Sequence, residues 1–300
     1  MANSCQVGIP RRLAFSRPCN LAYDSDLINY APKVDRIGKR MPDMAYFTRL
    51  SDTNFRATEH TGGAWSVTEQ HIAAPMGLLT HVIELDCARR GNGFKIGRLA
   101  FDILGVIPIG EVQTDVQSLR SGRTIELVEA TLLHNGRPAL RARAWLVKPN
   151  DTGAIAGNAM RRIPAPEGMP SWDPTTVWPG GFIATIDIRR AAGAPGRATY
   201  WARARQPLLE DEPVSPLARA ASLFDIANGM AVRAAPTEVA FPNLDLTAHL
   251  FATPRGEWLG FDTSVSFGAD GLGLTSSTIH DETGPIGTLA QILTIRPNIG

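Results

Sequence analysis

The sequence predicts an α+β fold made of two tandem units, each with one central helix and an antiparallel sheet wrapped around it. Two observations support this prediction. Strand-rich segments recur in the same order in both halves of the chain, and each half carries one helix candidate that is apolar on every side. A helix without a polar face is expected to be buried. A sheet that curls around the helix would bury it.

Four strands are predicted in each half, separated by the Gly, Asn and Pro residues that are typical of turns. In the first half they lie within RLAFDILGVIPIGEV, VQTDVQSLRSG, TIELVEATLLHNGRP and ALRARAWLVKP, beginning at Arg98. In the second half they lie within DLTAHLFATPRGEWL, GFDTSVSFGADG, LGLTSSTIHDETGP and IGTLAQILTIRP, beginning at Asp245. The turns and strand ends align as Gly110-Glu111 with Gly256-Glu257, His134 with His280, Pro138 with Pro285, and Lys148-Pro149 with Arg296-Pro297. Strand propensity fixes neither the positions nor the order of turns, so this match indicates an internal duplication.

One helix candidate precedes the strands of each half. The first lies within EQHIAAPMGLLTHVIELDCA and has Pro75 in its first turn, where proline is tolerated. The second lies within VSPLARAASLFDIANGM, with Ser215 as the N-cap and Pro216 at the first helical position. Each half therefore contains a strand, a helix and then strands. This is the arrangement of a hotdog fold, and the chain is predicted to be a double hotdog.

The duplication also predicts the domain boundaries. Residues 1–43 form an irregular N-terminal extension, with Met44 as an alternative start, and a tail that packs on the body is the other interpretation. Residues 44–150 form the first hotdog unit. The stretch 151–178 is rich in Pro and Gly and is predicted to be a linker. Residues 179–300 form the second unit, which carries the candidate catalytic residues.

Composition excludes several classes of protein. The formal net charge is +1, so the broad positive field of a nucleic-acid-binding protein is not expected. No apolar run is long enough to cross a bilayer, so no membrane insertion is expected. Cys5, Cys19 and Cys87 are too few and too irregularly spaced for a disulfide framework or a zinc site, which favours a cytoplasmic location and no metal. We expect no cofactor, because the sequence has no dinucleotide-binding or P-loop motif.

The most informative single residue is Asp225, because SLFDIANGM places a carboxylate within a helix whose neighbours are apolar. A buried charge requires a partner or a wet cavity. A structural Asp held by backbone groups or an arginine is the alternative. Glu84 has the matching position in the first helix, and Gln291 lies in the otherwise apolar strand LAQILTI. The alternating segment FPNLDLTAHL places Asn243 on a polar face, which is also compatible with simple solvent exposure.

Other residues are given structural roles. His249 and His280 lie in or at the end of predicted strands, where surface and turn positions are common. The tryptophans Trp65, Trp145, Trp201 and Trp258 are expected to fill space between the sheet and its neighbours, with the lining of an acyl tunnel as the alternative for one of them. The G-x-S-x-G motif of an α/β-hydrolase and the H-E-x-x-H motif of a metalloprotease are absent from the sequence.

The chain resembles the acyl-CoA thioesterases of type II over most of residues 50–298. The likeness is carried by NLDLTAHLFATPRGEWLGFDT, FGADGLGL and HDETGPIGTLAQILTIRP. In that family an Asp on the second central helix, a hydroxyl or amide residue at the start of the next strand, and a Gln on the last strand hold the hydrolytic water. The resemblance places these roles on Asp225, Asn243 and Gln291. The family more often carries Thr or Ser where Asn243 stands.

The resemblance also implies the substrate and the assembly. An acyl-CoA thioester is the implied substrate, and a homo-oligomer is a family-level expectation. Relatives open the first helix with His, two Gly and two Pro, and carry a Glu later in it. The corresponding residues here are the segment from His71 to Pro75 and the acid Glu84, and His71 and Glu84 are assigned to substrate binding. Both glycines are replaced, so the paired site of the first half is a candidate for a degenerate site.

Two alternatives to hydrolysis stay open. One is a noncatalytic acyl-CoA or lipid-binding hotdog protein that keeps the pocket without turnover. The other is an enoyl-CoA hydratase or dehydratase, which requires an Asp and a His that work as a pair near a helix start. No such pair is evident in the sequence.

Overall fold

The computed structural model describes residues 45–298 apart from residue 192, so the predicted extension over residues 1–43 lies outside the described residues. The described strands form a 13-stranded sheet and a separate two-stranded sheet. The large sheet is antiparallel throughout, and its strands follow the order β1-β2-β4-β5-β6-β3-β11-β14-β13-β12-β9-β8-β7.

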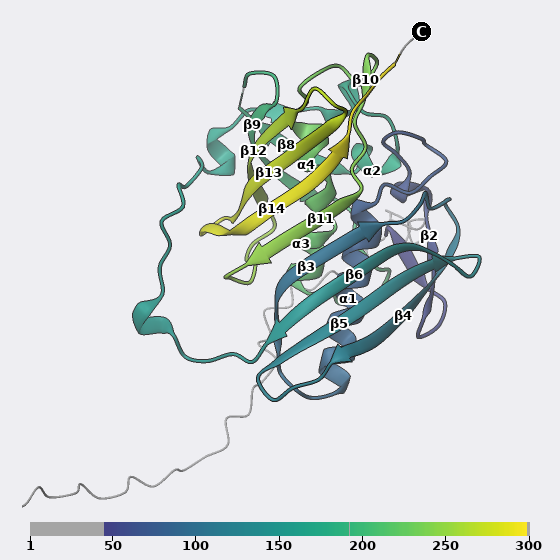
Figure 1. The fold of residues 1–300 in the computed structure, drawn as a ribbon, viewed down its shortest axis with the longest axis vertical. Helices are drawn as coiled ribbons and strands as arrows, with labels where there is room; N and C mark the ends of the chain where they lie inside the picture. Colours follow the sequence, from purple (N-terminus) through teal and green to yellow (C-terminus); the bar gives the residue numbers. More distant parts are fainter. Residues whose placement is uncertain (1–44, 192, 299–300) are drawn as a thin grey trace, which may run out of the picture.

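The first half of the sheet wraps around the long helix α1, as the apolar surface of that helix predicts (Figure 1). Its elements are β1 (Phe47–Arg49), β2 (Asn54–Ala57), η1 (Glu59–Thr61), α1 (Ala73–Arg89), β3 (Lys95–Ile103), β4 (Glu111–Arg120), β5 (Ile125–His134) and β6 (Arg137–Val147). The four strands predicted after the helix are confirmed.

The second half repeats this plan with shorter helices (Figure 1). Its elements are η2 (Gly153–Ile155), η3 (Pro166–Gly168), β7 (Ser171–Trp172), η4 (Pro174–Thr176), α2 (Gly181–Ala184), β8 (Ile186–Arg190), β9 (Arg197–Ala204), α3 (Pro216–Ala221), η5 (Phe224–Ile226), α4 (Ala227–Met230), β10 (Val239–Ala240), β11 (Asp245–Leu250), β12 (Leu259–Phe267), β13 (Leu272–Asp281), β14 (Gly284–Thr294) and β15 (Arg296–Pro297). The predicted strands are again confirmed, and the fold is a double hotdog.

The two halves join where β3 pairs with β11. The register runs from Asp102 opposite Asp245 to Arg98 opposite His249, so the two hotdog sheets continue into each other. The hairpins after β5 and β13 also correspond, because His134 and His280 are each in the last strand positions before a tight turn. The duplication seen in the sequence is therefore a duplication of structure.

The second central helix differs from its prediction. Ser215 caps α3 as expected, because its Oγ accepts a hydrogen bond from the backbone N–H of Ala218 at 3.0 Å. The predicted continuous helix is wrong beyond Ala221, because Leu223 has a φ of −120°, outside the helical range. A 3₁₀ turn follows, and Asp225 lies in this turn rather than in an α-helix.

The two central helices pack closely at Gly77. A Cβ atom added there would lie 2.6 Å from the Cβ of Ser222, so α1 and α3 could not approach this closely with a larger residue. The core between helices and sheet is apolar, and Met76, Leu79 and Phe224 are fully buried in it. This packing holds the turn that contains Asp225 against the first half of the chain.

The connector leaves β6 and crosses the outside of the molecule to the far edge of the sheet (Figure 1). Its last part is not irregular, since Ser171 and Trp172 of β7 pair with β8. The boundary at residue 178 stays a prediction.

Candidate active site

A pocket of about 500 Å³ lies where the two halves meet. The first half contributes the segment before α1 and the end of β3 with the residues after it, while the second half contributes the turn η5, helix α4 and the segment before β11. Most of the lining is apolar, including Trp65, Ile103, Leu104, Trp178, Ile226 and Leu244. Such a surface can hold an acyl chain, and the few polar groups on it are candidates for chemistry.

The glycine pairs Gly62-Gly63 and Gly180-Gly181 allow the backbones of the two halves to approach each other beside this pocket. A Cβ added at Gly180 would lie 2.4 Å from the carbonyl oxygen of Gly62, which no side chain could accommodate. The backbone N–H of Phe182 donates to the same oxygen at 2.9 Å. This contact fixes the segment before α1, and therefore the side chains that it carries, against the second half.

The structure brings together Asp225, Asn243 and Gln291, the three residues to which the resemblance assigns the hydrolytic water. Asp225 Oδ1 accepts a hydrogen bond from Asn243 Nδ2 at 2.7 Å and one from Gln291 Nε2 at 3.2 Å. Asn243 precedes β11 and Gln291 lies in the adjacent β14, and the pairing of these strands sets the distance between the two amides. Asp225 and Gln291 are buried, with exposed fractions of 8% and 1%.

Burial controls the ionisation of Asp225. Loss of hydration raises the pKa of Asp225 from 3.8 to about 7, while the hydrogen bonds from Asn243 and Gln291 oppose this increase. The carboxyl group therefore changes its protonation state near neutral pH, which is the range expected of a general base.

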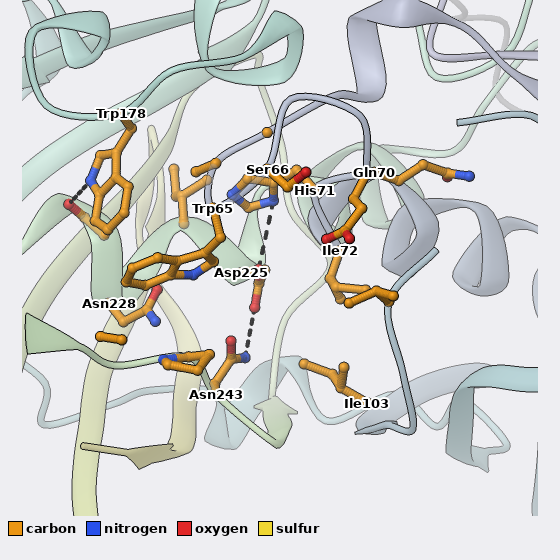
Figure 2. A pocket seen from close by; sticks show the side chains of 18 of the residues that line it. Trp65, Ser66, Gln70, His71, Ile72, Ile103, Trp178, Asp225, Asn228 and Asn243 are labelled. Carbon is orange, nitrogen blue, oxygen red and sulfur yellow. Dashed lines mark hydrogen bonds and ion pairs between the residues drawn. The ribbon is translucent and has the colours of Figure 1, made fainter. Parts of the chain in front are cut away.

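His71 approaches the same carboxylate from the other half of the chain. Its Nδ1 lies 3.6 Å from Asp225 Oδ2, and Figure 2 shows the ring and the carboxylate facing each other. The prediction that no Asp and His pair exists near a helix start is therefore wrong. The two residues are distant in sequence, and only the packing of the two halves brings them together.

The protonation of the His71 ring follows from its contacts. Burial lowers the pKa of His71 from 6.5 to about 3, so the ring is neutral at physiological pH. Nδ1 accepts a hydrogen bond from the backbone N–H of Ala73 at 3.2 Å, so the ring proton is on Nε2. The ring stacks on Phe182 with a centroid distance of 4.4 Å, which fixes its orientation.

Glu84 does not belong to this site. It lies further along α1, is not among the residues that line the pocket, and bonds to the hydroxyl of Ser215 at the start of α3. Burial raises the pKa of Glu84 to about 7, so the protonated acid is populated at neutral pH. The structure places Glu84 at a contact between the two central helices, and its role in substrate binding stays a prediction.

Trp178 and Asn228 line the pocket and were not identified from the sequence, whereas Trp65 has the pocket-lining position that was the alternative for one of the tryptophans. Trp65 is 47% exposed and contacts the Trp178 ring with a centroid distance of 5.0 Å, so it does not simply fill space under the sheet. The segments TGGAW and PGGF each place an aromatic residue after a glycine pair. Trp178 comes directly before the second of these segments, and no local pattern marks Asn228.

The described residues contain no group of three or more His, Cys, Asp or Glu side chains that could hold a metal ion. Cys87 is buried and unpaired, while Cys5 and Cys19 lie outside the described residues. In the part of the chain that the structure describes, no helix is both long enough and apolar enough to cross a membrane.

Comparison with known structures supports the fold. A putative thioesterase from Novosphingobium aromaticivorans is 21% identical, with a TM-score of 0.62 over 84% of this chain and 98% of that chain. A hot dog fold protein of unknown function from Alicyclobacillus acidocaldarius is 13% identical, with a TM-score of 0.65 over 85% and 97%. An acyl-CoA thioesterase II from Mycobacterium marinum is 18% identical, with a TM-score of 0.60 over 85% and 97%.

Comparison with protein families is more specific. No curated protein matches the chain significantly. The model of the acyl-CoA thioesterase N-terminal domain matches residues 61–147, and that of the acyl-CoA thioesterase C-terminal domain matches residues 162–295. The two matches cover most of the two hotdog units in the expected order, and the chain belongs to the acyl-CoA thioesterase family.

Proposed function

We propose that this protein hydrolyses acyl-CoA thioesters with a water molecule that is activated by Asp225. The observation that carries the proposal is the asymmetry of the Asp225 carboxylate. Oδ1 accepts both amide N–H groups, while Oδ2 faces the ring of His71 across 3.6 Å without a hydrogen-bond donor from the described residues. Oδ2 is thus the oxygen that is available to accept a proton from water.

Gln291 supports a water position next to this carboxylate. Its Nε2 bonds to Asp225, but its Oε1 is buried and has no hydrogen-bond partner among the described residues. Buried amide oxygens are normally satisfied, and an ordered water is a frequent partner. A water that donates to Gln291 would be held beside the acid that is proposed to activate it.

The proposed reaction needs no covalent intermediate. The ionised Asp225 accepts a proton from the water as the water oxygen attacks the thioester carbonyl carbon. The tetrahedral intermediate collapses by breaking the carbon–sulfur bond, and the leaving thiolate takes the proton from Asp225. Thiols have pKa values of about 8.5, whereas burial places the pKa of Asp225 at about 7. The protonated acid is therefore strong enough to protonate the thiolate.

His71 is the proposed donor to the thioester oxygen. The ring proton is on Nε2, which has no acceptor among the described residues, and Figure 2 shows this nitrogen turned away from Asp225. Negative charge develops on the carbonyl oxygen during attack, and a fixed neutral donor stabilises it. The start of α1, at Ala73, lies beside His71 and adds the positive end of a helix dipole. This assigns His71 to substrate binding and charge stabilisation.

A thiol-release assay over a series of acyl-CoA chain lengths tests the proposal. We expect the wild type to release CoA, and Asp225→Asn to lose about 100-fold or more in turnover because the general base is removed. Asp262→Asn is a matched control, since Asp262 lies on β12, pairs with Arg197 and does not line the pocket. A wild type that binds acyl-CoA without releasing thiol would favour the noncatalytic binding protein.

Reversible hydration of an enoyl-CoA is a second candidate function, and the contact between His71 and Asp225 favours it. In this reaction the water would attack the third acyl carbon instead of the thioester carbon, and a proton would be added to the second. Loss of the enoyl thioester absorbance without thiol release would support hydration. Thiol release from saturated acyl-CoA would support the proposed hydrolysis.

A cytoplasmic location, inferred from the sparse cysteines, and a homo-oligomeric state stay predictions. The described edge strands of the large sheet are β1 and β7, with 3 and 2 residues, so they offer few backbone groups for edge pairing. Light scattering at several protein concentrations would establish the mass of the assembly.

A further inference from the structure

Two buried polar side chains lie side by side on the inner face of the second sheet. Gln291 of β14 is directly opposite Thr275 of β13 in the strand register. Their exposed fractions are 1% and 0%, whereas the next residues along each strand, Ile292 and Leu274, are 41% and 50% exposed. Because side chains alternate along a strand, Gln291 and Thr275 both point towards the interior. Side chains that are directly opposite have Cβ atoms about 4.5–5.5 Å apart.

Each of these side chains has an atom without a hydrogen-bond partner. Thr275 Oγ1 and Gln291 Oε1 are both buried, and neither is bonded to another described residue or to the other. Buried polar atoms are normally paired with protein or with ordered water. A single water between the two side chains would pair both, because a water accepts a hydrogen bond from a hydroxyl and donates one to an amide oxygen.

The other neighbours of Thr275 in the sheet offer its hydroxyl no partner. Its cross-strand neighbour on β12 is Val265, which is apolar. Along β13, one neighbour on the inner face is a glycine, and the other is Ser277, whose hydroxyl is hydrogen-bonded to that of Thr263 at 2.8 Å. Among the side chains next to Thr275 in the sheet, Gln291 is therefore the one with a polar atom to spare.

The orientation of the Gln291 amide affects the ionisation of Asp225. Gln291 Nε2 donates to Asp225 Oδ1 at 3.2 Å, which stabilises the ionised carboxylate. The reversed amide would place Oε1 against the carboxylate and would suit only the protonated acid. A donor on the Thr275 side of Oε1 favours the orientation that stabilises the carboxylate. Because an amide oxygen has two lone pairs, Oε1 can also accept a hydrogen bond from the reactive water.

We propose that Thr275 is a positioning residue of the hydrolytic site, whose hydroxyl binds Gln291 Oε1 through one buried water and keeps Gln291 Nε2 directed at Asp225. This inference rests on the proposed function and deepens it by adding a residue behind the site. Thr275 does not line the pocket, so it acts through Gln291 and touches neither the acyl group nor the reacting atoms.

Thr275→Val tests this role, because valine keeps the shape of threonine and removes the hydroxyl. We expect kcat to fall by about threefold to tenfold, the range that one neutral hydrogen bond provides. KM should stay within about twofold, because Thr275 does not contact the substrate. The rising limb of kcat/KM should move to higher pH, because the ionised Asp225 loses support. Thr275→Ser keeps the hydroxyl and should restore the wild-type profile.

The shift of the rising limb reports on Asp225. His71 is the titratable side chain that the described structure places against this carboxylate. Burial lowers the pKa of His71 to about 3, so its ring stays neutral while Asp225 titrates.

Thr263→Val is the matched control. Thr263 is fully buried on the neighbouring strand β12, and its hydroxyl is already paired with Ser277. We expect this variant to lower Tm without moving the pH profile. An unchanged profile in Thr275→Val, an equal shift in both valine variants, or no rescue by Thr275→Ser would overturn the role of Thr275. If Thr275→Val does not fold, Thr275→Cys replaces it, because a thiol is only a weak donor.

The pKa of Asp225 gives a readout that does not depend on turnover. It is measured by carbon-13 NMR of proteins labelled at the aspartate carboxyl carbon, over a pH titration. A higher pKa of Asp225 in Thr275→Val than in the wild type and in Thr263→Val supports the role. Equal pKa values in the three proteins would overturn it. If the wild type releases no thiol, the proposed hydrolysis fails, and the role of Thr275 towards Gln291 and Asp225 is decided by this titration alone.

Discussion

His71 Nδ1 lies 3.6 Å from Asp225 Oδ2, although the two residues come from different halves of the chain. Neither atom carries a proton when Asp225 is ionised, because Nδ1 accepts a hydrogen bond from the backbone N–H of Ala73. The contact therefore disfavours the carboxylate and is compatible with a protonated acid or an intervening water.

Asp225→Asn should stabilise the protein at alkaline pH. The pKa of Asp225 is raised from 3.8 to about 7 in the folded state, so the folded state binds the proton more tightly than the unfolded state. The protonated Asp225 therefore adds to the free energy of unfolding at low pH, and this contribution is lost as the pH rises through about 7. An amide keeps the acceptor for Asn243 and Gln291 and removes the negative charge that faces the lone pair of His71 Nδ1.

Thermal unfolding measures this effect. We expect a higher Tm for Asp225→Asn at pH 8, with a gain of about 2–4 °C for each kcal/mol, and little difference from the wild type at pH 4. A lower Tm at pH 8 would mean that the carboxylate is well satisfied in the folded state.

Turnover should follow the ionisation of the same group. We expect kcat/KM to rise with pH through an apparent pKa of about 7 and to level off above it, because only the ionised carboxylate accepts a proton from water. Gln291→Leu removes a hydrogen bond that lowers the pKa of Asp225, so the rising limb should move to higher pH. The measurement is the pH profile of kcat/KM for the wild type and for Gln291→Leu. If the rising limbs of the two profiles coincide, the assignment of this limb to Asp225 is contradicted.

Asn243 offers a matched pair of variants. Asn243→Thr keeps a hydrogen-bond donor near Asp225 and introduces the residue more common in the family, so we expect kcat/KM within about fivefold of the wild type. Asn243→Val has the shape of Thr without the hydroxyl, and a lost hydrogen bond to a charged group costs about 1.5–3 kcal/mol. Equal activity of the two variants would show that position 243 contributes through shape alone.

The strands and their order were predictable because the repeat is visible in the sequence. Turn residues mark the ends of β5 and β13, and strand pairing then fixes their neighbours. The convergence of Asn243 and Gln291 on Asp225 was predictable only through the resemblance to a family, because no local pattern states which strands are adjacent. Ser215 was identified as an N-cap from local sequence, since capping depends on the nearest residues.

Contacts between the halves were not predictable. Apolar residues continue past Leu223, so periodicity gave no signal for the break that places Asp225 in a 3₁₀ turn. The His71 contact depends on how closely the halves pack, which Gly62 and Gly180 decide through backbone approach. Trp65 was one of four tryptophans expected to fill space, with the lining of an acyl tunnel as the alternative for one of them, and only the pocket shows that this one is Trp65.

Glu84→Gln tests whether Glu84 binds substrate or only joins the two central helices. An amide can still accept a hydrogen bond from Ser215 and carries no charge to bury, so we expect thiol release within about twofold of the wild type. The raised pKa of Glu84 predicts an unchanged or higher Tm for this variant at pH 8. A large increase in KM at unchanged Tm would return Glu84 to the substrate site.

The role of Asp225 as a base, rather than as a nucleophile, is tested most directly by a single turnover in isotopically labelled water with enzyme in excess over acyl-CoA. The proposed reaction predicts that the first molecule of free acid contains one labelled oxygen and that the Asp225 carboxylate contains none. An unlabelled acid together with a labelled Asp225 would show covalent attack by the carboxylate and would contradict activation of water.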